Sequence, residues 1–369
     1  MGNAISGARL MAQSHTQRKL VPTFVVTLDA LGTLYGFRQP VATQYAEVAR
    51  QCGLRDQIDP KSLNVAFKDA FKRANQTHPN YGKSSLSNPE QWWSLLVNDA
   101  FSQVVKPDRI PKDLGHRLYQ HFCSADAYEL YPDAQAFLES MKSLKAQYTR
   151  PDGPIVIVGV VTNSDPRVTQ VLQSMQLQVG WSSTPPLVSP IRDAIRSKDD
   201  NFSFDTRSPL YRAYNPDNDV DFVATSYEAG AEKPDRRIWD FARELLDMMP
   251  RSRAEQALDR QETHVSPRQH STGQMALAMA QSFAALISVE VGETRWIHVG
   301  DDFAKDYIGA ESVGLDALFV DRPENKRQSL RSDTQTVSSL QEAAMIVSLL
   351  AQQHINANTL NASSSSSQR

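Results

Sequence analysis

The feature that most limits the possible folds is a series of short, almost wholly apolar runs that alternate with helical segments. These runs are Thr23–Leu28, Ile155–Val161, Phe222–Thr225, Arg295–Val299 and Leu315–Val320. A continuous apolar run is typical of a strand that is buried on both faces of a parallel sheet. Strands that alternate with helices favour a parallel sheet covered by helices on both faces. The sequence therefore predicts an α/β fold with a Rossmann-like parallel sheet core.

A long segment without convincing strands follows the first apolar run. Between residues 37 and 130 the apolar side chains recur at helical spacing. Helices are expected over Val41–Cys52, Leu63–Ala74, Gln91–Phe101 and Asp113–Phe122. We interpret residues 37–130 as an all-helical cap inserted into the core, which then comprises residues 23–36 and 131–350.

Four other segments show neither the apolar runs of strands nor the helical spacing of apolar residues. Stretches near 181–219 and 251–270 are expected to be insertions in the core, because long structureless connections are usually accessory. Residues 1–22 are predicted to be a disordered leader. Residues 351–369, with their serine run, are predicted to be a disordered tail, because they hold too little apolar surface to fold.

Composition restricts the partners and the compartment. The formal net charge of −3 leaves no basic excess, so we expect no nucleic-acid partner. Cys52 and Cys123 are the only cysteines, which fits a reducing compartment. No apolar run approaches the roughly 20 residues that a transmembrane helix needs. We therefore expect a cytoplasmic protein, with the nucleus and the mitochondrion as alternatives.

The N-terminus allows three interpretations. Met1–Ser6 matches the pattern for N-myristoylation, which would place an acyl chain on Gly2 and give a possible membrane contact. The same residues could simply belong to a disordered leader. The absence of acidic residues before Asp29 would also suit a mitochondrial targeting peptide, although arginines are few.

Polar residues follow several of the apolar runs, and ligands of open α/β sheets bind at the carboxyl ends of the strands. The segments are Asp29–Leu34, Thr162–Ser164, Glu232–Asp235 and Gly300–Asp302, the last followed by Asp306. Each alone is typical of a helix cap or turn. Their order and context together resemble the four motifs of the haloacid dehalogenase superfamily.

This resemblance implies a hydrolase with Asp29 as a nucleophile that attacks a phosphoryl group. It implies Mg²⁺ held by Asp29 and Asp301, with Asp302 or Asp306 in support, because this ion prefers hard oxygen ligands. The substrate would be a small phosphorylated or similar anionic molecule.

The resemblance also assigns the remaining site residues. Lys233 would add a second positive charge, and Thr162 with the backbone N–H of Asn163 would hold the phosphoryl oxygens. Thr33 would orient the loop after the first strand.

Leu31 departs from the pattern of the superfamily's phosphatases, which have a second Asp at this position as general acid and base. Such a group is typically worth about 10² to 10⁴ in rate. Asp29–Leu34 differs from the first motif of the 2-haloacid dehalogenases only at Leu31, and those enzymes work without metal. Two alternatives therefore stay open: a metal-independent 2-haloacid dehalogenase-like hydrolase, and a catalytically weak protein that binds a ligand or partner.

The cap carries a narrower resemblance. His78–Gly82 followed by Gln91–Trp93 is similar to the cap of the haloacid-dehalogenase-like hydrolase domain-containing protein 3 group. We expect Trp92 and Trp93 to pack within the cap, since large aromatic side chains dominate cores. The histidines show no metal-ligand spacing, and His298 is expected to pack within its strand.

Overall fold

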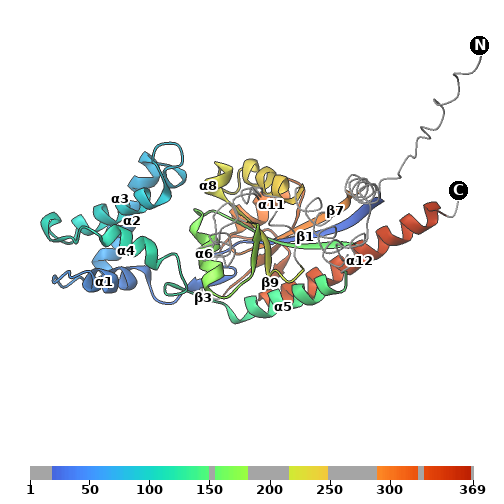
Figure 1. Cartoon of the computed structure of the whole chain (residues 1–369), viewed down its shortest axis with the longest axis horizontal. Helices are drawn as coiled ribbons and strands as arrows, with labels where there is room; N and C mark the ends of the chain where they lie inside the picture. Colours follow the sequence, from blue (N-terminus) through green and yellow to red (C-terminus); the bar gives the residue numbers. More distant parts are fainter. Residues whose placement is uncertain (1–18, 149–153, 182–215, 248–288, 323–327, 367–369) are drawn as a thin grey trace, which may run out of the picture.

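A computed structural model of the chain describes residues 19–148, 154–181, 216–247, 289–322 and 328–366 (Figure 1). These residues form a helical body at one end of the molecule and a sheet flanked by helices at the other. Gly2 and the stretch 251–270 lie outside the described residues, as does 182–215 of the first expected insertion.

The core is a seven-stranded sheet in the order β5-β6-β4-β1-β7-β8-β9, and every neighbouring pair is parallel. The strands are β1 (Lys19–Leu28), β4 (Ile155–Thr162), β5 (Val179–Trp181), β6 (Val220–Thr225), β7 (Val289–Gly300), β8 (Asp316–Val320) and β9 (Thr336–Val337). This confirms the predicted fold class. The five strands predicted from apolar runs are all present, and β5 and β9 are additional short edge strands.

The continuous apolar runs form strands because both faces of the sheet are covered. In β1, Phe24 and Val26 belong to one hydrophobic cluster and Val25 to the other, as the alternation of side chains requires. The first cluster contains residues of α5 (Pro132–Ala146) and α12 (Leu340–Ser366). The second contains residues of a helix over 236–247 and of the segment 303–312.

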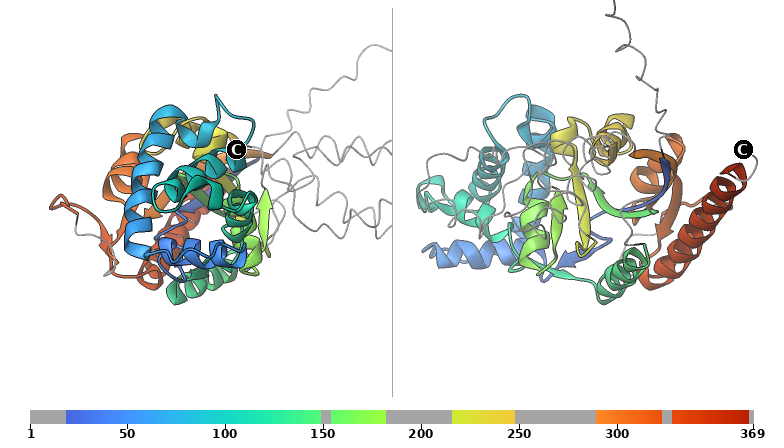
Figure 2. Two further views of the ribbon diagram at one scale, coloured as in Figure 1. Left: turned by 90° about the vertical axis from the view of Figure 1, so that its left-hand side faces the viewer. Right: turned by 45° about the vertical axis from the view of Figure 1, so that its right-hand side comes forward.

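Helices alternate with these strands, and Figure 2 shows them on both sides of the sheet. They include α6 (Arg167–Ser174), α8 (Ser226–Ala229), a π-helical turn η4 (Phe303–Ile308) and α11 (Gly309–Ser312). Pro234 lies just ahead of the helix over 236–247.

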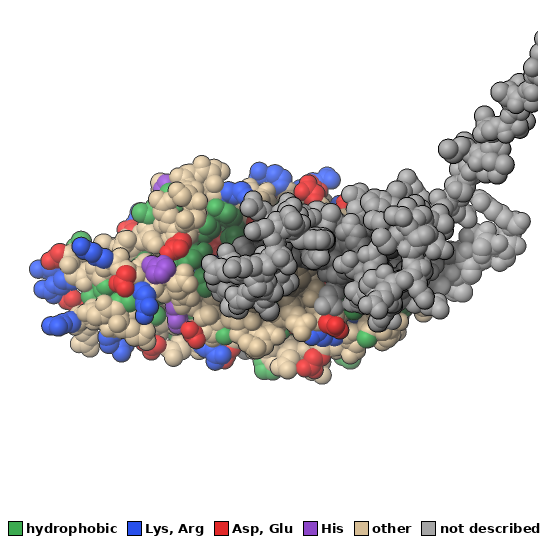
Figure 3. All heavy atoms as spheres, in the orientation of Figure 1, with side chains coloured by type: hydrophobic (Ala, Val, Ile, Leu, Met, Phe, Trp, Pro, Cys, Tyr) green, Lys and Arg blue, Asp and Glu red, His purple; other side chains and the backbone are tan. Residues whose placement is uncertain are grey.

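The inserted cap consists of α1 (Val41–Gln51), α2 (Pro60–Thr77), α3 (Pro89–Ser102) and α4 (Leu114–His121), with short 3₁₀ turns η1 (Asn80–Gly82) and η2 (Pro107–Arg109). Asp59 and Asn88 cap the N-termini of α2 and α3 by accepting hydrogen bonds from backbone N–H groups. The four helices lie where helical periodicity predicted them. Charged side chains of both signs are spread over the outer surface of the cap (Figure 3).

A two-stranded antiparallel ribbon joins the cap to the core. It pairs β2 (Tyr35–Phe37) with β3 (Tyr128–Leu130). The sequence analysis missed it because three-residue strands leave no recognisable periodicity.

Both predicted termini need correction. β1 begins at Lys19, so the expected leader over 1–22 overlaps the first strand. The expected tail over 351–369 is wrong, because α12 continues to Ser366 and buries Ala351 and Ile355 in the core. Packing against the sheet outweighs the polar composition of this segment. Within the described part of the chain, no helix combines the length and apolar character that crossing a membrane requires.

Candidate functional site

The predicted site residues gather where the order of the strands reverses. β4, β5 and β6 lie on one side of β1, and the later strands β7, β8 and β9 lie on its other side. The carboxyl ends of these three neighbouring strands are followed by Asp29, the Thr162 loop and Asp301. A crevice at such a switch point is the usual ligand site of an open α/β sheet.

Lys233 connects two of the acidic residues. Its Nζ donates to Asp29 Oδ1, Asp306 Oδ1 and the carbonyl oxygen of Val161, each at 2.7 Å. All three ammonium hydrogens therefore have an acceptor. The side chains of Lys233 and Asp306 are each only 1% exposed, so this ion pair is shielded from water.

Three carboxylates lie close enough to share a cation. Oxygen atoms of Asp29, Asp301 and Asp306 are within 4.8 Å of one another. They carry three negative charges against the single positive charge of Lys233, and their oxygens are the hard ligands that Mg²⁺ prefers. The residues present therefore fit a divalent cation.

Two glycines allow these carboxylates to approach the backbone. A Cβ atom on Gly32 would lie 2.5 Å from Asp301 Oδ2, and a Cβ on Gly300 would overlap the carboxyl group of Asp306. Gly32 also has φ 95°, a conformation that other residues rarely adopt. Position 32 therefore requires glycine for both space and backbone conformation, and position 300 requires it for space.

Burial and the ion pair have opposing effects on the acidic groups. Burial raises the pKa of Asp29, and Lys233 only partly opposes this. Burial would also raise the pKa of Asp306, but the charge of Lys233 and a hydrogen bond from His298 outweigh it and hold that pKa well below its usual range. Burial would lower the pKa of Lys233, yet the two carboxylates raise it, so the lysine stays charged.

Asp302 does not join the other acidic residues. Its carboxylate caps η4 by accepting from the N–H groups of Ala304 at 3.1 Å and Lys305 at 3.0 Å. It also pairs with Lys305 Nζ at 2.7 Å. Of the two residues expected in support of the metal, the structure places Asp306 in the cluster and Asp302 at the helix cap.

The loop after β1 is held by hydrogen bonds to two other segments of the core. Thr33 Oγ1 donates to Asp301 Oδ1 at 2.8 Å. Arg322 donates from Nε to the Gly32 carbonyl at 3.0 Å and from Nη2 to the Thr33 carbonyl at 2.7 Å. The sequence analysis missed Arg322, which lies far along the chain in no recognisable motif.

Asn163 and Thr162 occupy different places beside the cluster. Asn163 Oδ1 accepts from the backbone N–H of Lys233 at 2.6 Å, and its Nδ2 donates to the Lys233 carbonyl at 3.0 Å. The amide side chain of Asn163 therefore positions the lysine. Thr162 is buried, and its hydroxyl group hydrogen-bonds to Asp29 and lowers the pKa of that carboxyl group.

A buried hydrogen-bonded chain lies behind Asp306. Trp296 Nε1 donates to Thr27 Oγ1 at 2.9 Å, and Thr27 Oγ1 is hydrogen-bonded to His298 Nδ1 at 2.9 Å. His298 Nε2 faces Asp306 Oδ1 at 3.4 Å, and because a carboxylate can only accept, we assign the ring proton to Nε2 and the Thr27 hydroxyl as the donor to Nδ1. Burial lowers the pKa of His298, so the ring is neutral, and it supports the carboxylate besides packing in its strand.

Comparison with known proteins finds relatives that are similar to most of the chain. No protein-family model matches the sequence. An uncharacterized protein of Saccharomyces cerevisiae is 28% identical over 81% of this chain and 72% of its own length. The haloacid dehalogenase-like hydrolase domain-containing protein 3 of Danio rerio is 25% identical over 84% and 90%, and that of Homo sapiens 22% over 81% and 82%.

The chain is similar over most of its length to proteins of the haloacid dehalogenase superfamily. These relatives are similar to both the cap and the core, since each match spans about four fifths of the chain. The resemblance to the domain-containing protein 3 group, first suggested by the cap residues, is thereby confirmed. The names of the Danio rerio and Homo sapiens relatives describe hydrolase-like proteins and give no substrate.

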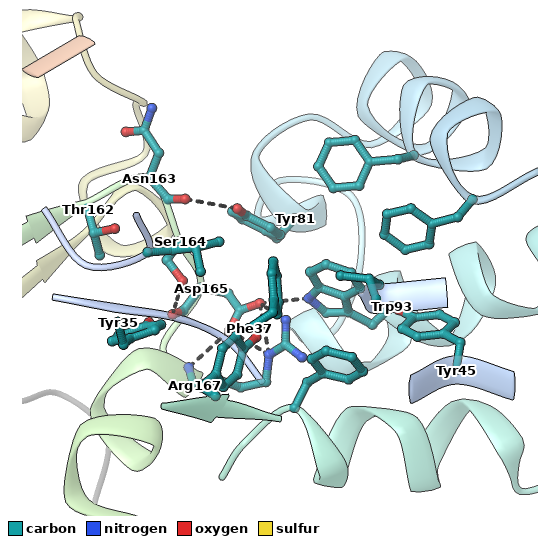
Figure 4. Close-up of a pocket in the computed structure, with 16 residues that line it drawn as sticks. Tyr35, Phe37, Tyr45, Tyr81, Trp93, Thr162, Asn163, Ser164, Asp165 and Arg167 are labelled. Carbon is teal, nitrogen blue, oxygen red and sulfur yellow. Dashed lines mark hydrogen bonds and ion pairs between the residues drawn. The ribbon is translucent and has the colours of Figure 1, made fainter. Parts of the chain in front are cut away.

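A cavity of about 290 Å³ lies between cap and core (Figure 4). Leu31, at the position of the missing acid, lines it and is 42% exposed. Asp29 does not line the cavity, but Thr162, which hydrogen-bonds to Asp29, forms part of its wall together with Asn163. The remaining apolar and aromatic lining comes from both bodies: Tyr35, Phe37, Val41, Tyr45, Phe67, Phe71, Tyr81, Trp93, Phe122 and Tyr128.

One buried ion pair completes the cavity wall. Asp165 Oδ2 accepts from Arg167 Nη2 at 2.9 Å and from Trp93 Nε1 at 2.7 Å. The guanidinium of Arg167 also lies over the rings of Trp93 and Tyr119, at 4.4 and 4.6 Å from their centres. Trp93 therefore does more than pack within the cap, because it joins α3 to the core.

Proposed function

We propose that this protein is a Mg²⁺-dependent phosphatase-type hydrolase that uses Asp29 as nucleophile on a small phosphorylated substrate. The observation that carries the proposal is the shared ion pair of Lys233 with Asp29 and Asp306, with Asp301 beside them. The reaction requires the Asp29 carboxylate to approach an anionic phosphoryl group. The positive charge of Lys233, and of a cation held by the three carboxylates, would reduce the repulsion between them.

The charges assign distinct roles to these residues. Asp29 is 14% exposed and can reach a substrate, whereas the 1% exposed side chain of Asp306 acts as a fixed countercharge. Lys233 favours the ionised, nucleophilic form of Asp29 against the effect of burial. Mg²⁺ held by Asp29, Asp301 and Asp306 would supply further positive charge for the phosphoryl oxygens.

We further propose that the helices of residues 37–130 serve as the cap over this site. The turn η1 contacts the core directly: Asn80 Nδ2 donates to the Ser226 carbonyl at 2.7 Å and Lys83 Nζ to the Glu228 carbonyl at 3.0 Å. Tyr81 donates to the Asn163 carbonyl at 3.0 Å. A cap in this position excludes water from the reacting groups.

The test is phosphate release from a panel of phosphate monoesters with Mg²⁺ or with EDTA. We expect turnover only with Mg²⁺, and its loss in Asp29→Asn. Asp302→Asn is the matched control, because asparagine caps helices as well as aspartate does and this side chain lies outside the cluster. Release that is unaffected by Asp29→Asn would contradict the proposal.

The dehalogenase alternative makes the opposite prediction. It requires chloride release from 2-chloropropionate in EDTA and a cation that binds the substrate carboxylate. The candidates for this cation in the cap are Arg38, Lys72 and Arg73, and all three side chains are exposed. Arg38 pairs with Glu129, and Arg73 pairs with Asp69 and Asp99. Chloride release without metal would overturn the proposed phosphatase.

A further inference from the structure

We propose that the preferred substrates are aryl phosphates, in which an uncharged aromatic group leaves as a phenolate from the cavity between cap and core. This inference rests on the proposed function and specifies its substrate class. Two independent features carry it: the lining of the cavity and the side chain at position 31.

The lining favours a flat, apolar group. The rings of Phe71 and Trp93 lie 6.3 Å apart and those of Tyr81 and Trp93 lie 6.1 Å apart, so the cap presents a continuous aromatic wall. Figure 4 shows Tyr81 and Trp93 across from Thr162 and Asn163, and Phe71 also lines the cavity. Aromatic groups pack best in offset-stacked or edge-to-face arrangements, which a wall of this kind offers.

The charges of the cavity favour a neutral group. Among its lining residues, only Asp165 and Arg167 carry charge. Arg167 donates to Asp165 from both Nε and Nη2, and it is sandwiched between Trp93 and Tyr119. Since these charges already satisfy each other, a charged leaving group would be desolvated in the cavity without compensation.

Leu31 selects for a leaving group that departs without a proton. When Asp29 Oδ attacks phosphorus, the P–O bond to the leaving group breaks and that oxygen takes the electron pair. A phenol ionises near pH 10, whereas water, and similarly an alcohol, ionises near pH 15.7. An aryl phosphate can therefore release phenolate unassisted, but an alkyl phosphate needs an acid that position 31 does not supply.

The tyrosines of the cavity are poor substitutes for that acid. Burial raises the pKa of Tyr128 to about 12, and it raises the pKa values of Tyr45 and Tyr81 further still. The hydroxyl of Tyr81 already donates to the Asn163 carbonyl. Leu31 consequently decides which leaving groups can depart.

The second half of the reaction leads to a separate expectation. Water must attack the Asp29 acyl phosphate, its proton passing to solvent or to the departing phosphate, which regenerates the carboxylate. With Leu31 no side chain at that position activates the water. The acyl phosphate should therefore accumulate, and phenolate release should show an initial burst close to one equivalent per site.

The test compares four substrates with the full chain in Mg²⁺. 4-Nitrophenyl phosphate has an aryl, good leaving group; acetyl phosphate has a good but non-aromatic one. Benzyl phosphate is aromatic with a poor leaving group, and ethyl phosphate has neither property. We expect kcat/KM for the aryl ester to exceed that for benzyl and ethyl phosphates by at least about 10²-fold, the typical contribution of an acid.

Two variants separate the features. Leu31→Asp should raise kcat/KM for benzyl phosphate by about 10² to 10⁴-fold and abolish the burst. Phe37→Ala should lower kcat/KM for the aryl ester by about 3- to 10-fold and lower kcat/KM for acetyl phosphate by a smaller factor. Leu95→Ala is the control, because this side chain of α3 is 47% exposed and does not line the cavity.

The outcomes are distinguishable from failure of the proposed function. Equal kcat/KM for aryl and alkyl phosphates would overturn the inference and leave the phosphatase intact, as would Phe37→Ala slowing acetyl phosphate as much as the aryl ester. No turnover and no burst with any of the four phosphates would overturn both.

Discussion

Replacing Lys233 by Met tests whether the buried ion pair holds the site together. Methionine keeps the apolar stem but removes the ammonium, which leaves Asp29 and Asp306 facing each other without their shared cation. Both ion pairs are 2.7 Å long, and the Lys233 side chain is 1% exposed, so solvent cannot take over its role. Breaking a buried pair by removing one partner costs about 3–5 kcal/mol.

We therefore expect Lys233→Met to lower the free energy of unfolding by about 3–5 kcal/mol in EDTA, measured by urea denaturation with tryptophan fluorescence. Mg²⁺ should recover part of this loss and stabilise the variant more than the wild type, because it replaces the missing charge. Asp29→Asn in the same background should also recover part of it.

Lys305→Met is the matched control. Lys305 pairs with Asp302 at the same 2.7 Å, but the two side chains are 50% and 35% exposed. Exposed pairs typically contribute less than about 1 kcal/mol. If Lys233→Met cost no more than this control, or if Mg²⁺ stabilised both variants equally, the charge balance inferred for the site would be wrong.

Three further substitutions test the supporting contacts. Arg322→Lys cannot reproduce the two hydrogen bonds to the loop after β1, so Mg²⁺ affinity measured by calorimetry should fall by about 10- to 100-fold. His298 has a lowered pKa, so only the unfolded chain gains this proton as the pH falls below about 6.5. The free energy of unfolding of the wild type should then decrease by up to about 1.4 kcal/mol per pH unit. The variant His298→Asn should lack this decrease, and identical pH profiles of the two proteins would refute the prediction. Trp93→Phe removes the hydrogen bond to Asp165, which should cost about 1.5–3 kcal/mol in urea denaturation.

The strands and cap helices could be predicted because their signals are local. β4 is apolar throughout because it lies between β1 and β6 with helices on both faces, and that environment leaves a continuous β-branched run in the sequence. The cap helices bury only one side, so their apolar residues recur at helical spacing. By contrast, α12 depends on contacts with β1, such as that of His354 with Phe24, and its own composition does not reveal them.

The site was predictable as a group of loops but not in its finer geometry. Asp302 and Asp306 both follow β7, and either could have supported a metal by sequence alone. Which one joins the cluster depends on the start of η4, where Asp302 caps the turn and its N–H donates to Asp306 Oδ2 at 2.9 Å. Arg322 and Arg167 were missed because their partners come from distant loops and from the cap.

The most direct test of the account is a crystal structure of the full chain grown with Mg²⁺ and an unreactive phosphate mimic. We predict one Mg²⁺ coordinated by oxygens of Asp29, Asp301 and Asp306, with the mimic beside Lys233 and its organic part in the aromatic cavity. Density for the ion elsewhere, or Asp29 turned away from a bound mimic, would contradict the central claim that these residues form a single hydrolytic site.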